Sequence, residues 1–209
     1  MRLERVLVGW ALVAASLGAR AEPVCEVLAV RGEARVAGQA LAVGQGLEVG
    51  AEIRTGAGGR VRLRFADGSV LVVADHSLLK LARYEAGPGK PREASLLLET
   101  GLIGQQVSKV PGGAWEVRTP TAVTAVRGTE FIVEVGADLA TAVNVQSGQV
   151  AVEALQSAAG GGTRSLRPRS VVVLERAQAA TQCSPAQGCS AAEAWPAERL
   201  KASQDRLAF

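Results

Sequence analysis

The sequence predicts an all-β protein, with many short antiparallel strands in a roll or a solenoid-like stack and a short C-terminal helix or tail. Short runs rich in β-branched residues alternate apolar and polar side chains, and turns containing glycine separate them at intervals of ~8–12 residues. The helical spacing of 3.6 residues is missing from these runs. The chain of 209 residues is 48% hydrophobic and 21% charged, which is enough apolar material for one packed core.

The first 21 residues have the pattern of a signal peptide. Arg2 and Arg5 precede the apolar stretch 6–17, which is too short to cross a bilayer comfortably. Residues 19–21, Ala-Arg-Ala, fit a cleavage site. We therefore expect a cleaved signal peptide and export to the periplasm or a similar compartment, with an uncleaved N-terminal anchor as the alternative.

Removal of this segment changes the charge of the chain. It carries three arginines and one glutamate, so the formal net charge falls from +3 to +1 on cleavage. A nearly neutral chain binds polyanions poorly, so nucleic acid is not an expected partner. No later run of 18 uncharged apolar residues occurs, so no transmembrane span is expected in the mature chain.

The strand pattern is clearest in residues 60–73. Val61, Leu63 and Phe65 share one face, and arginines occupy the other. Asp67-Gly68 is typical of a tight turn, so a hairpin is predicted here. A second hairpin is predicted from residues 130–136 and 140–145.

Three further segments place a glycine between apolar arms: VRGEARV (30–36), LETGLIGQQV (98–107) and VQSGQVAV (145–152). We interpret each as a hairpin whose apolar face is covered by its neighbours, which favours stacking. Their spacing is too irregular to establish a strict solenoid. The segment AGPGKPRE (86–93) predicts an exposed loop.

The β domain is predicted to cover residues 22–176, and residues 177–209 are predicted to form a tail. Pro196 is suited to the first turn of a short helix, in which Leu200 and Leu207 would share a face. Cys183 and Cys189 can close a small disulfide loop in an oxidising compartment. Cys25 could pair with either of them instead, so the pairing stays open.

The sequence offers little evidence for catalysis. His76 is the only histidine, which argues against a Ser-His-Asp arrangement and against a metal site. The segment RTGAGGR (54–60) lacks the Gly-Lys-Ser/Thr ending of a phosphate loop and precedes a strand, so a turn is predicted. We therefore predict no catalytic, cofactor-binding or metal-binding residues and no cofactor.

The apolar run 119–135 contains Arg127-Gly128-Thr129-Glu130. Gly128 sits where the alternation changes face, which predicts a bulge or bend. Arg127 either binds an anionic group of a ligand or satisfies nearby carbonyls or a carboxylate such as Glu130. We favour the second interpretation, in which Arg127 is structural.

This segment resembles the FecR domain family. The residues that carry the resemblance are Thr119, Pro120, Arg127, Gly128, Thr129, Glu130, Phe131 and Gly148, with Asp67 and Gly68 in the first half. The resemblance covers about residues 24–153 and implies an extracytoplasmic all-β module without catalytic residues. In the founding members of the family, this module is the periplasmic part of an anti-sigma regulator that senses an outer-membrane siderophore receptor.

Here the β domain follows the signal peptide directly, so we expect a stand-alone exported domain rather than a regulator that holds a sigma factor. The expected function is non-catalytic binding of an envelope or periplasmic protein or ligand, in connection with cell-surface signalling. The alternative is a structural envelope subunit that self-assembles through its β layers. A hydrolase is a remote alternative.

Overall fold

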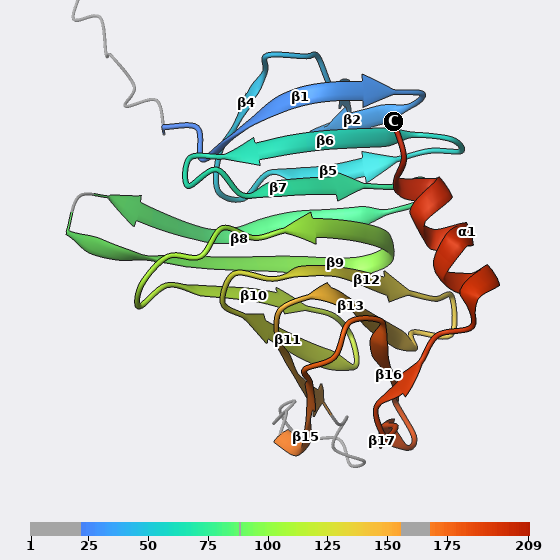
Figure 1. The fold of residues 1–209 in the computed structure, drawn as a ribbon. Helices are drawn as coiled ribbons and strands as arrows, with labels where there is room; N and C mark the ends of the chain where they lie inside the picture. The colour runs from blue at the N-terminus through green and yellow to red at the C-terminus, as the bar shows by residue number, and fades with distance from the viewer. Residues whose placement is uncertain (1–21, 88, 156–167) are drawn as a thin grey trace, which may run out of the picture.

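The computed structural model describes residues 22–87, 89–155 and 168–209. The predicted signal peptide lies outside these residues. The described residues form one extended mixed sheet that folds over into two layers, together with one helix (Figure 1). We call the layers the first sheet and the second sheet.

The first sheet contains, in spatial order, β4 (Gly46–Leu47), β1 (Cys25–Arg31), β6 (Arg60–Phe65), β7 (Val70–Val73), the second half of β9 (Lys90–Gln106), β12 (Glu130–Val135), β13 (Thr141–Ser147) and β16 (Ala179–Ser184), with β17 (Gly188–Cys189) and β18 (Glu193–Ala194) beside β16. The second sheet contains β3 (Gln39–Ala40), β2 (Ala34–Val36), β5 (Glu52–Thr55), β8 (Leu78–Gly87), the first half of β9, β10 (Ala114–Arg118), β11 (Ala122–Val126), β14 (Val150–Leu155) and β15 (Pro168–Leu174). Because β9 pairs in both sheets, it joins the two layers.

The main core lies between the two sheets. Alternation along each strand sends one set of side chains inward, and Val61, Leu63 and Phe65 of β6 are all buried there. The Phe65 ring packs edge-on against Trp115 of the second sheet, with 4.9 Å between ring centroids. Burial of each large apolar side chain stabilises the fold by about 1.5–3 kcal/mol. The predicted fold class is confirmed.

Both predicted hairpins are present. β6 and β7 pair antiparallel around Asp67-Gly68, and β12 and β13 pair antiparallel around Gly136. At the first turn, the Asp67 carboxylate accepts hydrogen bonds from the backbone N–H of Ser69 at 3.0 Å and from its hydroxyl at 2.7 Å. The tight turn predicted from Asp67-Gly68 is therefore present and is stabilised by the Asp67 side chain.

The interpretation of the three glycine-containing segments as hairpins is wrong. In each, the chain leaves one sheet and enters the other: from β1 to β2, within β9, and from β13 to β14. At the corner in β9, Gly101 has φ +99°, and a Cβ there would lie 2.1 Å from the Ser77 hydroxyl. Glycine thus permits a sharp exit from a sheet as readily as a hairpin turn.

Two other expectations need correction. Residues 90–93 belong to β9, which pairs with β8 across the segment that was predicted as a loop. The pairing of β9 with β10 is parallel rather than antiparallel, with Trp115 opposite Ala94. The chain crosses to the first sheet at Gly101, within β9, and returns to the second sheet before β10, so the first half of β9 and β10 run in the same direction.

The C-terminal segment packs on the first sheet. β16 pairs with β13, so this sheet continues past residue 176, where a tail was predicted to begin. The predicted helix is present as α1 (Ala197–Leu207), with Leu200 buried against the outer face of the sheet. A disulfide joins Cys183 to Cys189 on adjacent strands, and Cys25 is a buried free thiol.

Among the described residues, no helix has the length and apolar character needed to cross a membrane.

Candidate functional site

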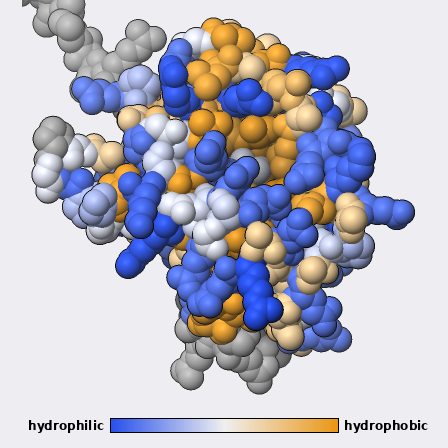
Figure 2. Space-filling view, viewed as in Figure 1, coloured by the Kyte–Doolittle hydropathy of each residue, from blue (hydrophilic) through white to orange (hydrophobic). Residues whose placement is uncertain are grey.

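A groove of about 550 Å³ lies on the outer face of the first sheet, beside α1. Its floor is apolar and comes from β7, β9 and β12, which are neighbours, and from β1: Leu28, Val70, Val72, Gly104 and Ile132. Figure 2 shows this region as a hydrophobic hollow between polar side chains. The groove is thus an apolar surface on the outside of the molecule, and it is separate from the core between the sheets.

The sequence of β7 explains why this face is apolar. Leu71 and Val73 point inward and are fully buried, whereas Val70 and Val72 point outward and are half-buried. A strand with one solvated face would carry polar residues at the outward positions. The continuous apolar run VLVV therefore indicates a strand with two apolar faces, whereas the hairpin predicted from the sequence required only one.

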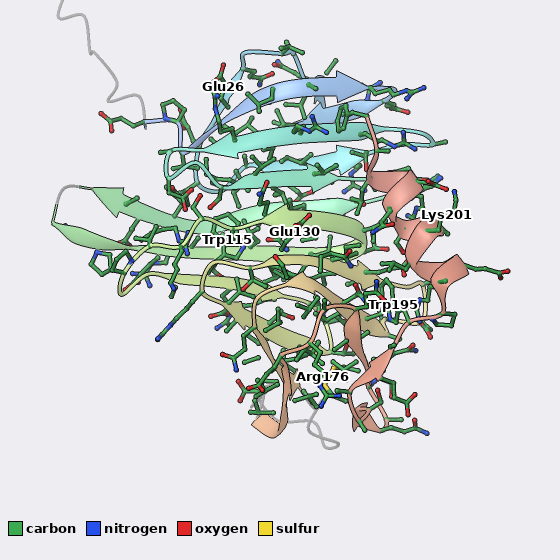
Figure 3. All side chains as sticks on the ribbon, viewed as in Figure 1. Glu26, Trp115, Glu130, Arg176, Trp195 and Lys201 are labelled. Atoms are coloured by element: carbon green, nitrogen blue, oxygen red, sulfur yellow. A yellow bond between two sulfur atoms is a disulfide. The ribbon has the colours of Figure 1, made fainter. Side chains whose placement is uncertain are left out.

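Polar side chains form the rim of the groove. Arg62 lines the groove, with its guanidinium 4.6 Å from the centre of the Phe209 ring. Gln106 and Gln146 line it as well. Glu130 of β12 is exposed and has no ion pair within the described residues (Figure 3). The rim can therefore supply one carboxylate, one guanidinium and several amides to a partner.

The helix α1 forms one wall of the groove through Gln204, Leu207 and Ala208. Gly104 makes room for Leu207, because a Cβ at this glycine would lie 2.8 Å from Leu207 Cδ1. Arg206 ties the helix to the sheet, donating to Asp75 and to Glu134 at 2.9 Å each. The wall is therefore fixed by both apolar contacts and partly exposed ion pairs.

Arg92 is buried, whereas Arg127 is exposed. Arg92 is 1% exposed and donates to the Asp67 carboxylate and, at 3.0 Å, to the Ser108 carbonyl. Its guanidinium lies 5.2 Å from the centre of the Trp115 ring. This burial could not be predicted from the sequence, because Arg92 follows a Gly- and Pro-containing stretch that is typical of loops.

Arg127 is exposed and has no hydrogen bond or ion pair with any described residue. The expectation that Glu130 or nearby carbonyls satisfy it is wrong. Arg127 borders a hollow of about 430 Å³ on the outer face of the second sheet, near Ala125, Ala151 and Val173. β11 and β12 lie in different sheets, so Arg127 and Glu130 emerge on different surfaces.

The bend at Gly128 is present, with φ +74° at the corner between β11 and β12. The register of β12 against β13 shifts immediately afterwards, between Glu130 and Phe131. Thr129 is buried and its hydroxyl donates to the Gln149 carbonyl at 2.9 Å. Gly148 lies directly opposite, since a Cβ there would be 3.0 Å from the Thr129 hydroxyl oxygen.

The comparisons with known proteins agree with this architecture. Residues 51–151 match the family model described as FecR protein. Residues 51–151 carry a FecR domain. The resemblance seen in the sequence is thereby confirmed over most of its predicted extent. The search of curated proteins found no match.

Two crystal structures of a candidate anti-sigma factor from Parabacteroides distasonis share the fold of this chain. Both are 22% identical to the chain over 72% of its length, with TM-scores of 0.55 and 0.53. The matched part spans 62% and 63% of the length of those chains. At this identity, the likeness describes the fold.

The motif residues Thr119 and Pro120 lie at a corner of the structure, beside Thr121 and Thr141. The hydroxyl oxygens of Thr119 and Thr121 each lie 2.7 Å from that of Thr141, and all three are buried. Thr121 also donates to the Cys183 carbonyl at 3.3 Å. Pro120 is exposed beside this cluster. The threonines thus connect the start of β11 to the strand that carries the disulfide.

The groups with chemical reactivity are dispersed over the described residues. The side chain of His76 is 68% exposed, and its Nε2 lies 4.0 Å from the Asp75 carboxylate. Burial raises the pKa of the Cys25 thiol to about 12, which keeps it protonated and unreactive. The described residues contain no group of three or more His, Cys, Asp or Glu side chains placed to hold a metal ion.

Proposed function

We propose that this FecR protein is an exported, non-catalytic interaction module that binds a protein of the cell envelope through the groove on its first sheet. The groove carries the proposal. Its floor leaves apolar side chains half-exposed on the outside of a molecule whose core is already complete between the sheets. Apolar surface of this kind, surrounded by polar residues, is typical of protein interaction sites.

A role in cell-surface signalling is the further part of the proposal. It is supported by the FecR family match and by the shared fold with a candidate anti-sigma factor. Export is supported by the signal-peptide pattern of residues 1–21 and by the disulfide between Cys183 and Cys189. A disulfide persists in the periplasm and is reduced in most cytosols.

Photo-crosslinking in the producing cell tests the proposal. A photo-reactive amino acid replaces Val72 in the groove, and in a separate variant it replaces Lys80, which is exposed on the second sheet. We expect a reproducible envelope protein cross-linked from position 72 and absent from position 80. Failure to obtain a cross-linked protein from position 72 would count against the groove as the binding site.

Self-assembly is the second candidate function, and β15 supports it. Val171 and Val173 on this strand are 61% and 46% exposed, and β15 pairs only with β14 among the described residues. A strand edge with apolar side chains is suited to pairing with another chain. Sedimentation velocity of the mature protein distinguishes the two functions, because a strict monomer at high concentration would exclude self-assembly.

A further inference from the structure

We propose that the occupant of the groove is an amphipathic helix of the partner protein, which lies on the first sheet alongside α1. This inference rests on the proposed function and specifies the kind of partner segment. The same face of the sheet already holds one helix. Leu200 of α1 is buried against Leu102 and Ile132, and Leu207 lies over Gly104.

The groove continues the surface on which α1 packs. Gly104 and Ile132 contact α1 on one side and line the groove on the other. α1 runs across the strands in Figure 1, and the residues lining the groove likewise come from β1, β6, β7, β9, β12 and β13, which are successive neighbours. A second helix parallel to the axis of α1 would therefore cover the rest of one continuous apolar surface.

The dimensions of the groove set the length of the occupant. Six adjacent strands at a spacing of about 4.8 Å span roughly 24 Å. A helix rises 1.5 Å per residue, so about 16 residues, or four to five turns, would cross this distance. The volume of about 550 Å³ accommodates several apolar side chains from one face of such a helix.

The backbone of the sheet explains why a helix fits better than an extended segment. β6, β7, β9 and β12 each pair on both sides where they line the groove, so their hydrogen-bonding groups are already used within the sheet. An extended peptide on the apolar floor would bury backbone N–H and C=O groups without partners. A helix satisfies these groups internally and presents only side chains.

The rim indicates where the partner helix carries polar groups. Glu130 has no ion pair among the described residues and lies at the edge of the floor. A lysine or arginine on the partner helix would pair with it. Gln204 of α1 donates to Gln146 at 3.1 Å, and this amide pair borders the apolar floor on the α1 side. The partner helix should therefore carry apolar residues at spacings of three and four along one face, with a basic residue at the edge of that face.

The segment cross-linked from position 72 provides the test. Its sequence is identified by mass spectrometry, and a synthetic 16-residue peptide of that segment is titrated onto the purified mature protein by fluorescence anisotropy. We expect apolar residues at the spacing i, i+3, i+4, i+7 and an increase in peptide helicity on binding, measured by circular dichroism. Val72→Glu should weaken binding at least about tenfold, as expected for loss of a central apolar contact.

Two controls keep the outcome decisive. Val171→Glu places the same charge on the second sheet and should leave the affinity unchanged. A proline in the middle of the peptide should abolish binding, because it breaks a helix. A cross-linked segment that binds without becoming helical, or that tolerates the proline, would overturn the helix inference while leaving the groove as a protein-binding site. Absence of any cross-linked segment from position 72 would overturn both proposals.

Discussion

At the scale of single residues, Arg92 and Arg127 each occupy the environment opposite to the one that its sequence context favours. Arg127 lies in an apolar run and is exposed. Arg92 follows a Gly- and Pro-containing stretch and is buried against Asp67 and Trp115. A buried charge left without its partner is strongly destabilising, whereas an exposed arginine without contacts contributes little.

Arg92→Met should therefore lower the free energy of unfolding by about 3–5 kcal/mol, because it leaves the Asp67 carboxylate buried without its partner. Arg127→Ala is the matched control and should change it by less than about 0.5 kcal/mol. Urea unfolding followed by circular dichroism measures both. Equal losses in the two variants would mean that Arg127 is structural after all.

Gly128 provides a second prediction at this scale. Alanine in the left-handed conformation lowers the free energy of unfolding by about 1–2 kcal/mol. The control is Gly38→Ala, which should show this conformational cost alone. At Gly38 φ is +77°, and no atom lies within 4 Å of the added Cβ. Gly128→Ala should cost more, because its Cβ would lie 2.7 Å from Lys109 Cβ. The same unfolding measurement compares them, and indistinguishable values would show that Lys109 moves aside freely.

At the scale of elements, α1 is a small unit attached to a large sheet. Leu200 is its main apolar contact, and its ion pairs to Asp75 and Glu134 are partly exposed. Such pairs contribute modestly and weaken with salt. The helix should therefore open more readily than the strands beneath it.

Leu200→Ala should accelerate amide hydrogen exchange across 197–207 and leave exchange in β6 unchanged, because the variant removes the contact that holds α1 on the sheet. Lys201→Ala is the control, since Lys201 is exposed on the side of α1 away from the sheet (Figure 3). Mass spectrometry of exchanged peptides reads out both segments. Faster exchange in β6 as well would indicate that α1 supports the whole sheet.

At the scale of the whole molecule, the two sheets enclose one continuous core with two buried groups that titrate at high pH. Burial raises the pKa of Cys25 from 9.0 to about 12 and that of Tyr84 from 10.0 to about 12. Between about pH 9 and pH 12, both groups are still neutral in the folded protein but already ionise in the unfolded chain. Their contribution to stability is complete below pH 9 and is lost as the pH rises towards 12.

The free energy of unfolding should therefore decline steadily above about pH 9. Cys25→Ala should flatten this decline, because only Tyr84 of the two groups then remains. The free energy of unfolding of the variant, relative to that of the wild-type protein, should be lowest below pH 9 and rise above it. Urea unfolding at a series of pH values between 7 and 11 measures the slope. An unchanged slope in the variant would contradict a buried, protonated thiol at position 25.

The sequence by itself determined the all-β class, the hairpins at 60–73 and 130–145, the bend at Gly128 and the helix that begins after Pro196. These features depend on alternation and turn chemistry between residues close in the chain. The groove, the burial of Arg92, the exposure of Arg127 and the crossing of the chain between sheets at Gly101 were decided only by the tertiary structure. They depend on which strands become neighbours, and a glycine between two apolar arms permits a hairpin or a corner equally well. Packing between distant segments selects the corner here, because it lets each layer bury its inner face against the other sheet.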